Sequence, residues 1–208
     1  MYCPPAFREE ELPALHELMR AARLANVVTS GANGLHASPL PLILDETEGP
    51  YGTLYGHLAR ANDQWKDTPV GEALAIFMGP DAYVTPSWYA SKKEHGKVVP
   101  TWNYTVVQAR GPIEFFDDEA RLRGVVERLT TLHEKGRAEI WSVSDAPEKF
   151  IMGQLRGIVG LRFPITNLEG KRKMSQNRSA ADRAGVAAGL AASAHPAERA
   201  VAAEIPQD

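Results

Sequence analysis

The feature that most constrains the fold of this chain is a succession of short β-forming runs separated by turn signals. These runs begin after an amphipathic segment at residues 7–24, and clusters such as Gly31-Ala32-Asn33-Gly34 divide them. The runs do not alternate with helical segments in the way that parallel βαβ units require. The pattern therefore predicts antiparallel strands that close into a barrel.

The expected elements follow from the spacing of apolar residues. Recurrence every three or four residues indicates a helix, and alternation or a short apolar run indicates a strand. The expected helices cover residues 7–24, 117–133, 147–155 and 179–194. The expected strands cover residues 26–30, 35–44, 53–58, 73–78, 82–85, 98–116 and 158–168, with a bend at Gly111-Pro112.

Composition is typical of a folded globular protein. The 208 residues are 44% apolar and 24% charged, close to the usual averages. We expect one mainly β domain with helices, of the α+β class. Residues 1–170 are expected to form the barrel with an N-terminal helix and a helical insertion, 171–190 a polar segment and helix of the same domain, and 191–208 a disordered tail.

Charge and cysteine content argue against several classes of function. The formal net charge is −3, so the chain as a whole does not attract DNA phosphates, and direct DNA binding is not expected. No run approaches the ~18 apolar residues of a spanning helix. The single cysteine, Cys3, excludes an intrachain disulfide and a multi-cysteine metal site. We expect a cytoplasmic protein with no membrane association and no metal.

A phosphate pocket is predicted where the strand at residues 53–58 ends. Arg60 and Asn62 follow that strand, and Asn62 stands where a helix N-cap would lie. The N-terminus of a helix offers N–H donors and a positive dipole end, and the arginine fork matches phosphate oxygens. The alternative is an ordinary surface pair between Arg60 and Asp63.

Two segments combine aromatic rings with hydrogen-bonding groups. Residues 79–89 place hydroxyls and two neighbouring aromatic rings at the end of a strand. In residues 99–104, Thr101 and Asn103 share one face of a strand and Trp102 lies on the other. Such groups can wall a flat ring system and bond its edge. The alternatives are a structural plug and a half-buried strand.

A third segment, residues 170–178, carries four cations and three neutral hydrogen-bonding side chains within nine residues. This set can clamp an anion or the polar edge of a ring system. The alternative is a solvated turn that leads to a helix cap at Asn177 or Ser179.

These motifs resemble the PaiB family, described as FMN-binding negative transcriptional regulators. The family motifs HAxPLP, GHxARAN, YVSPSWY, VPTWNY and GKxKxSQNR read here, in order, as residues 36–41, 56–62, 83–89, 99–104 and 170–178. The resemblance runs from about Phe7 to Leu190. Two departures are mild: Thr85 replaces the usual serine, and Asp63 stands where proline is frequent.

The resemblance implies a split β-barrel of the pyridoxamine-phosphate-oxidase and flavin-reductase type, in a homodimer that holds FMN between its subunits. The residues it implies as FMN contacts are Ser38, His57, Leu58, Arg60, Asn62, Ser87, Trp88, Tyr89, Thr101, Trp102, Asn103, Lys173 and Gln176. The sequence identifies no catalytic residue, although His36 and His57 are candidates for an acid or base.

Three functions are compatible with such a flavin site. The resemblance implies a transcriptional regulator or redox sensor, and the absence from the sequence of a helix-turn-helix with a basic recognition helix favours indirect regulation. The alternative is an oxidoreductase that acts on a small substrate with NAD(P)H. Haem binding through a histidine is a third, less favoured function of this fold.

Overall fold

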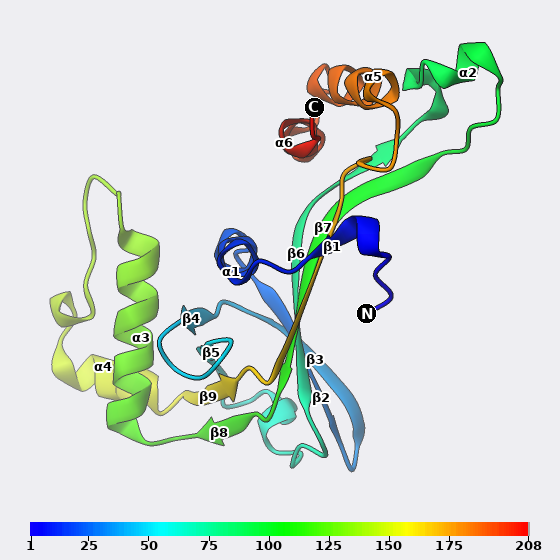
Figure 1. Ribbon diagram of the computed structural model, residues 1–208. Helices are drawn as coiled ribbons and strands as arrows, with labels where there is room; N and C mark the ends of the chain where they lie inside the picture. The colour runs from blue at the N-terminus through cyan, green and yellow to red at the C-terminus, as the bar shows by residue number, and fades with distance from the viewer. Residues whose placement is uncertain (208) are drawn as a thin grey trace. The chain divides into compact units, whose positions relative to one another are not determined.

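The computed structural model describes residues 1–207, which form six α-helices and ten strands (Figure 1). The helices are α1 (Leu12–Ala21), α2 (Ser91–Glu94), α3 (Glu119–Glu134), α4 (Glu148–Leu155), α5 (Ala180–Ala191) and α6 (Pro196–Glu204). The strands are β1 (Arg8–Glu9), β2 (Ala25–Gly31), β3 (Gly34–Leu40), β4 (Ile43–Asp45), β5 (Thr53–Ala59), β6 (Ala73–Val84), β7 (Thr101–Gly111), β8 (Glu114–Phe116), β9 (Ile158–Pro164) and β10 (Asn167–Lys173).

The chain divides into two compact units. The first unit contains residues 1–18, 78–107 and the chain from residue 169 onward. The second contains residues 19–77 and 108–168. Strands β6 and β7 each contribute residues to both units. The units interleave along the chain, because residues of the first unit come before, between and after those of the second.

The second unit contains a four-stranded antiparallel sheet in the order β4-β5-β9-β8, together with neighbouring strands in the order β6-β2-β3. Side chains alternate along β9, where Val159, Leu161 and Phe163 are buried. Strand β5 pairs with β9 so that Tyr55 lies opposite Arg162 and His57 lies opposite Gly160. This register decides which side chains share a face of the sheet.

Helices α3 and α4 supply the apolar core beside this sheet. Asp118 caps α3 by accepting a hydrogen bond from the backbone N–H of Arg121 at 2.8 Å. The buried cluster comprises Ile43, Phe116, Leu122, Val125, Leu129, Val143, Ile151 and Leu155. Burial of each large side chain stabilises the fold by roughly 1.5–3 kcal/mol. The helical spacing predicted for residues 117–133 and 147–155 is confirmed.

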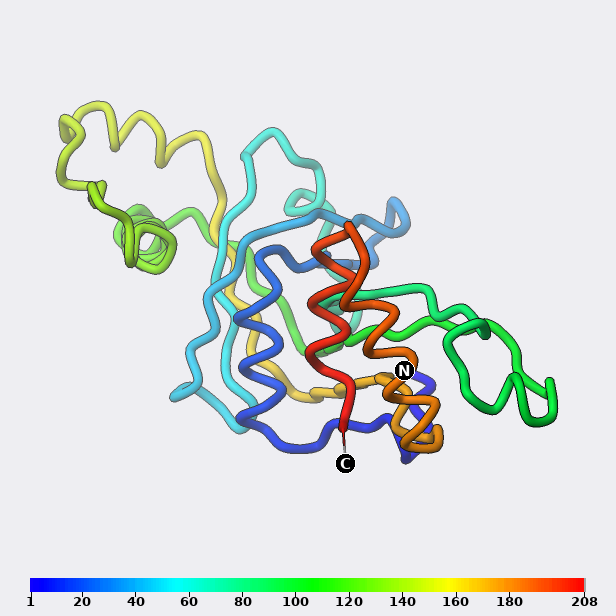
Figure 2. Tube along the Cα trace, turned by 90° about the horizontal axis from the view of Figure 1, so that it is seen from above, coloured from blue at the N-terminus to red at the C-terminus, as the bar shows by residue number. Residues whose placement is uncertain are grey.

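The first unit contains strands in the order β1-β10-β7-β6 and the two C-terminal helices. Arg8 of β1 pairs with Lys171 of β10. Helices α5 and α6 lie side by side in orange and red (Figure 2). The side chain of Ser179 caps α5, so of the two caps predicted, Asn177 and Ser179, the second is confirmed.

The C-terminal segment differs from the predicted disorder. Helix α6 begins with Pro196 in its first turn and buries Val201 and Ile205 against α5 and its neighbours. Two apolar side chains in an alanine-rich helix are enough here, because alanine lets the two helices pack closely. The prediction of a disordered tail is therefore wrong for residues 196–205, and residue 208 lies outside the described residues.

Several predicted boundaries also change. Helix α1 begins at Leu12 because Pro13 is tolerated only in a first turn. The two predicted strands at residues 73–78 and 82–85 are one strand, β6. The predicted bend at Gly111-Pro112 is confirmed, since it separates β7 from β8. Within residues 1–207, no helix combines the length and apolar character needed to cross a membrane.

The bend at Gly111 provides a test of the packing in the second unit. A Cβ atom at Gly111 would lie 1.9 Å from the carbonyl oxygen of Pro164, so the backbone must move to admit a side chain. We expect Gly111→Ala to destabilise the protein by about 2 kcal/mol or more and to lower Tm by about 4 °C or more. Thermal unfolding measures both.

The matched control is Gly153→Ala in α4. A Cβ atom there meets nothing within 4 Å, and alanine favours the helix by roughly 1 kcal/mol. An unchanged Tm for Gly111→Ala would contradict the close approach of the two backbones.

Candidate functional site

Five predicted site residues lie in the second unit, and two of them contact each other. Asn62 donates from Nδ2 to the Ser38 hydroxyl at 2.8 Å, and its Oδ1 accepts from the backbone N–H of Gln64 at 2.9 Å. Asn62 thereby caps a short 3₁₀ helix, Asp63–Trp65, and the predicted N-cap is confirmed. The amide of Asn62 links this turn to strand β3.

Arg60 is anchored by backbone carbonyl groups. Its Nε donates to the carbonyl of Arg156 at 2.8 Å, and its Nη2 donates to that of Ile158 at 3.1 Å. Its Nη1 lies 3.5 Å from a carboxylate oxygen of Asp117. The alternative pair with Asp63 does not form, because Asp63 accepts from Lys66 at 2.8 Å. The remaining N–H groups of Arg60 are available to a ligand, and its phosphate contact stays a prediction.

His57 is the residue of this group whose polar atoms are least satisfied. Its Nδ1 is buried and has no hydrogen-bond partner among residues 1–207. Burial lowers the pKa of the imidazole below its usual 6.5, so the ring is neutral at pH 7. Leu58 differs, since its side chain is 3% exposed and belongs to the core. Only the backbone of Leu58 remains for a ligand contact.

In the first unit, Lys173 connects two of the predicted motifs. Its ammonium donates to the hydroxyl of Thr101 and to the carbonyl of Trp102. Burial lowers the pKa of Lys173, and the nearby charges of Lys171 and Arg178 lower it further. The ammonium is therefore held in a fixed position beside two other cations.

We refer to Lys171, Lys173 and Arg178 as the cation cluster. Within the part of the chain that the structure describes, none of the three forms an ion pair. Arg172, which lies between two of them, instead pairs with Glu204 at 2.7 Å. Among the three cations, Asp182 lies within electrostatic reach of Arg178 only. Three neighbouring cations that form no ion pair within residues 1–207 suit an added anion with two charges, such as a phosphate monoester. Lys171 and Arg178 were not among the predicted contacts, although both lie in the cationic segment 170–178.

Two other predicted contacts in this unit stabilise the turn after β10. Asn103 is fully buried, and its side-chain amide exchanges hydrogen bonds with the Ser175 hydroxyl at 3.0 and 3.1 Å. Gln176 accepts from the backbone N–H of Met174 and donates to the carbonyl of Arg172. Ser175 needs this support because its φ is 61°, in the left-handed region. Both side chains thus hold the cation-bearing segment in shape.

The aromatic motif at residues 83–89 is largely structural. Trp88 packs against α5, where a Cβ atom on Gly189 would lie 2.3 Å from the indole. Tyr89 is 2% exposed, its hydroxyl has no partner among residues 1–207, and Arg178 stacks over its ring at 4.7 Å. The Ser87 hydroxyl accepts from Lys92 at 3.1 Å. The plug interpretation therefore fits Trp88 and Tyr89.

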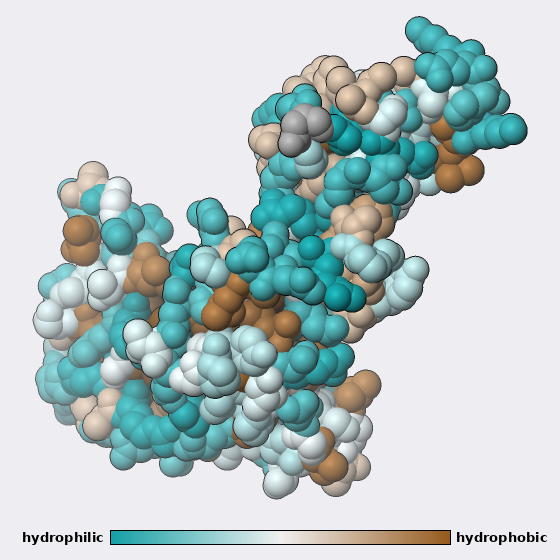
Figure 3. Space-filling view, viewed as in Figure 1, coloured by the Kyte–Doolittle hydropathy of each residue, from teal (hydrophilic) through white to brown (hydrophobic). Residues whose placement is uncertain are grey.

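The second unit also contains an apolar cavity outside the predicted site. Its volume is about 300 Å³, and its apolar wall includes Leu42, Leu54 and Phe77. Apolar residues are visible beside β4 and α3 in brown (Figure 3). None of the predicted FMN contacts lines this cavity.

Comparison with known proteins decides the family. A family model described as "Putative FMN-binding domain" matches residues 1–167. The chain belongs to this family. Its cofactor is FMN, as the sequence motifs predicted.

Two relatives and one solved structure illustrate the similarity. Protease synthase and sporulation protein PAI 2 of Bacillus subtilis is 29% identical, covering 88% of this chain and 85% of its own. An uncharacterized protein of Aspergillus fumigatus is 33% identical, covering 91% and 90%. The structure of the FAD and heme binding protein from Mycobacterium smegmatis has a TM-score of 0.57 at 17% identity, covering 80% of this chain and 73% of that one. The predicted PaiB resemblance and split-barrel fold are confirmed.

The residues present fit FMN chemically. In the first unit, the cation cluster forms no ion pair within residues 1–207, which suits the phosphate. In the second unit, the unpartnered Nδ1 of His57 is a separate hydrogen-bonding position. The predicted contacts fall in both units.

Lys173 provides a test of the phosphate position. We expect Lys173→Gln to raise the Kd for FMN about tenfold or more, because it removes one charge-assisted hydrogen bond worth roughly 1.5–3 kcal/mol. Titration of apoprotein with FMN, followed by flavin fluorescence, measures the Kd.

The control is Lys97→Gln, which removes the same charge from an exposed position in the same unit. A bound phosphate raises the pKa of Lys173, which burial lowers in the FMN-free protein. The affinity for FMN should therefore be greatest below the pKa that Lys173 has without FMN, and it should fall as pH rises through that pKa. Lys173→Gln should lose this decline. Equal Kd values for both variants would exclude Lys173 as a phosphate contact.

Proposed function

We propose that this protein is an FMN-dependent redox sensor that regulates transcription through a partner. Membership of the FMN-binding family and similarity to a sporulation protein support the proposal. The observation that carries it is the cation cluster, since its three charges fit one phosphate while the net charge of the chain is −3. A protein of this charge has a local anion site without a general attraction to DNA.

In this proposal each part of the chain has a separate task. The cation cluster binds the FMN phosphate, and Thr101 holds the Lys173 ammonium in place. Asn103 and Gln176 keep the turn that carries these cations rigid. When bound, FMN supplies the ability to take up and release electrons. His57 is neutral at pH 7 and can accept a hydrogen bond or a proton at Nδ1.

We also propose a homodimer in the cytoplasm. Tyr83 and Trp102 form an edge-to-face pair with ring centroids 6.0 Å apart, yet both rings are exposed. Met78 and Val99 in the same unit are exposed as well. Exposed aromatic and apolar side chains of this kind are enriched in subunit interfaces. The single cysteine, Cys3, is compatible with a reducing compartment.

The second candidate function is a flavin-dependent oxidoreductase that uses NAD(P)H. His57 favours it, because a neutral, half-buried imidazole with an unpartnered nitrogen is suited to proton transfer. Haem binding ranks third, and its support is the similar fold of the FAD and heme binding protein from Mycobacterium smegmatis.

Steady-state kinetics distinguish a sensor from an enzyme. We expect the FMN-loaded protein to oxidise NAD(P)H no faster than free FMN at the same concentration, because a sensor needs a single redox change rather than turnover. Absorbance at the NAD(P)H band measures the rate. Sustained turnover that falls in His57→Gln, with flavin content unchanged, would instead establish the oxidoreductase.

DNA binding tests whether regulation is indirect. At physiological salt we expect no nanomolar binding of the purified protein to DNA, since few phosphate contacts are available to a chain of net charge −3. Fluorescence anisotropy over a salt series measures the affinity. A tight and sequence-selective complex would show that the protein reads DNA directly.

A further inference from the structure

A second cavity in the second unit is lined by three arginines and two aromatic rings. It lies where α3 meets β5, β8 and β9, and its volume is about 320 Å³. The lining contains Arg121, Arg128, Arg162, Tyr55, Phe116 and Gly124, and among residues 1–207 no acidic residue lines it. We refer to this cavity as the arginine pocket. None of the predicted FMN contacts belongs to it.

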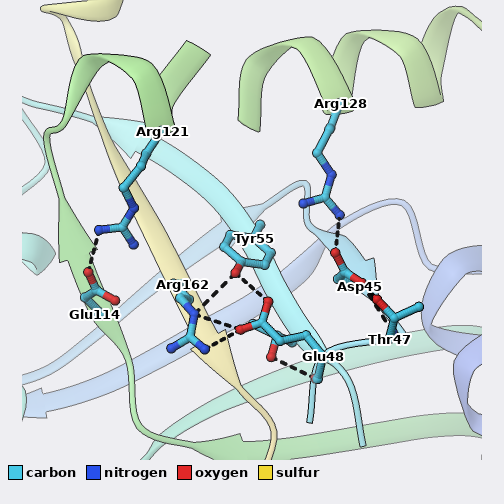
Figure 4. Close-up of polar contacts among 9 residues, drawn as sticks. Asp45, Thr47, Glu48, Tyr55, Glu114, Arg121, Arg128 and Arg162 are labelled. Atoms are coloured by element: carbon cyan, nitrogen blue, oxygen red, sulfur yellow. Dashed lines mark hydrogen bonds and ion pairs between the residues drawn. The ribbon is translucent and has the colours of Figure 1, made fainter. Parts of the chain in front are cut away.

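Each arginine is positioned by one carboxylate that does not line the pocket (Figure 4). Arg121 donates to Glu114 at 2.8 Å, and Arg128 donates to Asp45 at 3.0 Å. Glu48 accepts from Arg162 in the same way. A guanidinium carries five N–H donors, so each arginine keeps donors beyond those used by its carboxylate.

The hydroxyl of Tyr55 completes the arrangement. It donates to Glu48 at 2.6 Å and accepts from Nε of Arg162 at 3.2 Å. The side chains of Tyr55, Glu48 and Arg162 therefore form one closed network at the centre of Figure 4. The position of the Arg162 guanidinium is fixed from two sides.

The other two guanidinium groups lie over aromatic rings. Arg121 stands 3.8 Å from the centroid of Phe116, and Arg128 stands 5.3 Å from that of Tyr55. Stacking and ion pairing together restrict both side chains before any ligand arrives. The side chains therefore lose less conformational entropy when an anion binds in the pocket.

Gly124 keeps one side of the pocket open. A Cβ atom built there meets nothing within 4 Å, although the neighbouring positions of α3 carry side chains. The volume lies at the lower end of the roughly 300–1,000 Å³ of small-molecule sites, which leaves room for an organic group beside an anionic head.

We propose that the arginine pocket binds a small organic phosphate through its phosphate group. Arginine forks pair with phosphate oxygens in two-point hydrogen bonds, and three forks from α3 and β9 match a group that has three terminal oxygens. The rings of Tyr55 and Phe116 offer apolar surface to the organic part. This site is independent of the flavin function.

The test uses the full-length, FMN-loaded protein and three probes: adenosine monophosphate, ribose 5-phosphate and inorganic phosphate. We expect an organic phosphate to bind with a Kd of about 1 mM or tighter by calorimetry. Arg128→Lys keeps the charge but loses the fork, and we expect it to weaken binding about tenfold. The flavin absorbance should not change.

The decisive variant is Gly124→Leu, which fills the open side of the pocket and removes no ion pair. We expect it to abolish binding of the organic phosphates without lowering Tm, since leucine favours the helix over glycine. Gly153→Leu is the matched control, because it places the same side chain on another helix of the same unit, in open space.

Four results would overturn the proposal. One is the absence of binding by both organic phosphates. Another is binding that Gly124→Leu leaves intact, because the ligand would then lie elsewhere. The third is equal and weak binding of inorganic phosphate and both organic probes, which would indicate an unspecific ion contact. Displacement of FMN by the probes would also contradict a separate site.

Discussion

The antiparallel pairing of β5 with β9 is the constraint on which most of the second unit depends. Tyr55 and His57 lie on one face of β5, and Leu54 and Leu58 lie on the other face in the core. The pairing places Arg162 opposite Tyr55. A slip of one residue would send the leucines to the wrong face, so core burial enforces the register that also positions the polar side chains.

The register was predictable only in part. Alternation of apolar residues located most strands, and the flavin motifs predicted the fold and the cofactor. The strand partners could not be derived, because pairing depends on packing between segments far apart in the chain. Glu48 and Arg162, for example, are separated by 114 positions, and no local pattern indicates that they meet.

Contacts between distant segments also explain why the motifs did not predict the role of each residue in the site. Asn62 acts as the predicted cap because capping is local. Arg60 donates to the carbonyls of Arg156, just before β9, and of Ile158, the first residue of β9, which only the folded chain brings near. Asn103 and Gln176 match the family motif, yet their hydrogen bonds stabilise a strained turn. A sequence motif identifies the residues that a family shares. The structure shows which of their side chains hold the backbone in place and which have hydrogen-bond donors left for a ligand.

The pairing of Arg172 with Glu204 gives the end of the chain an electrostatic role. Glu204 is the last residue of α6, and the helix is anchored by the buried side chain of Val201. Cleavage ahead of α6 would remove that carboxylate and leave Arg172 with only its longer pair to Glu9, at 3.7 Å. A shortened form of the protein would therefore carry one negative charge fewer beside β10 and attract polyanions more strongly at this surface.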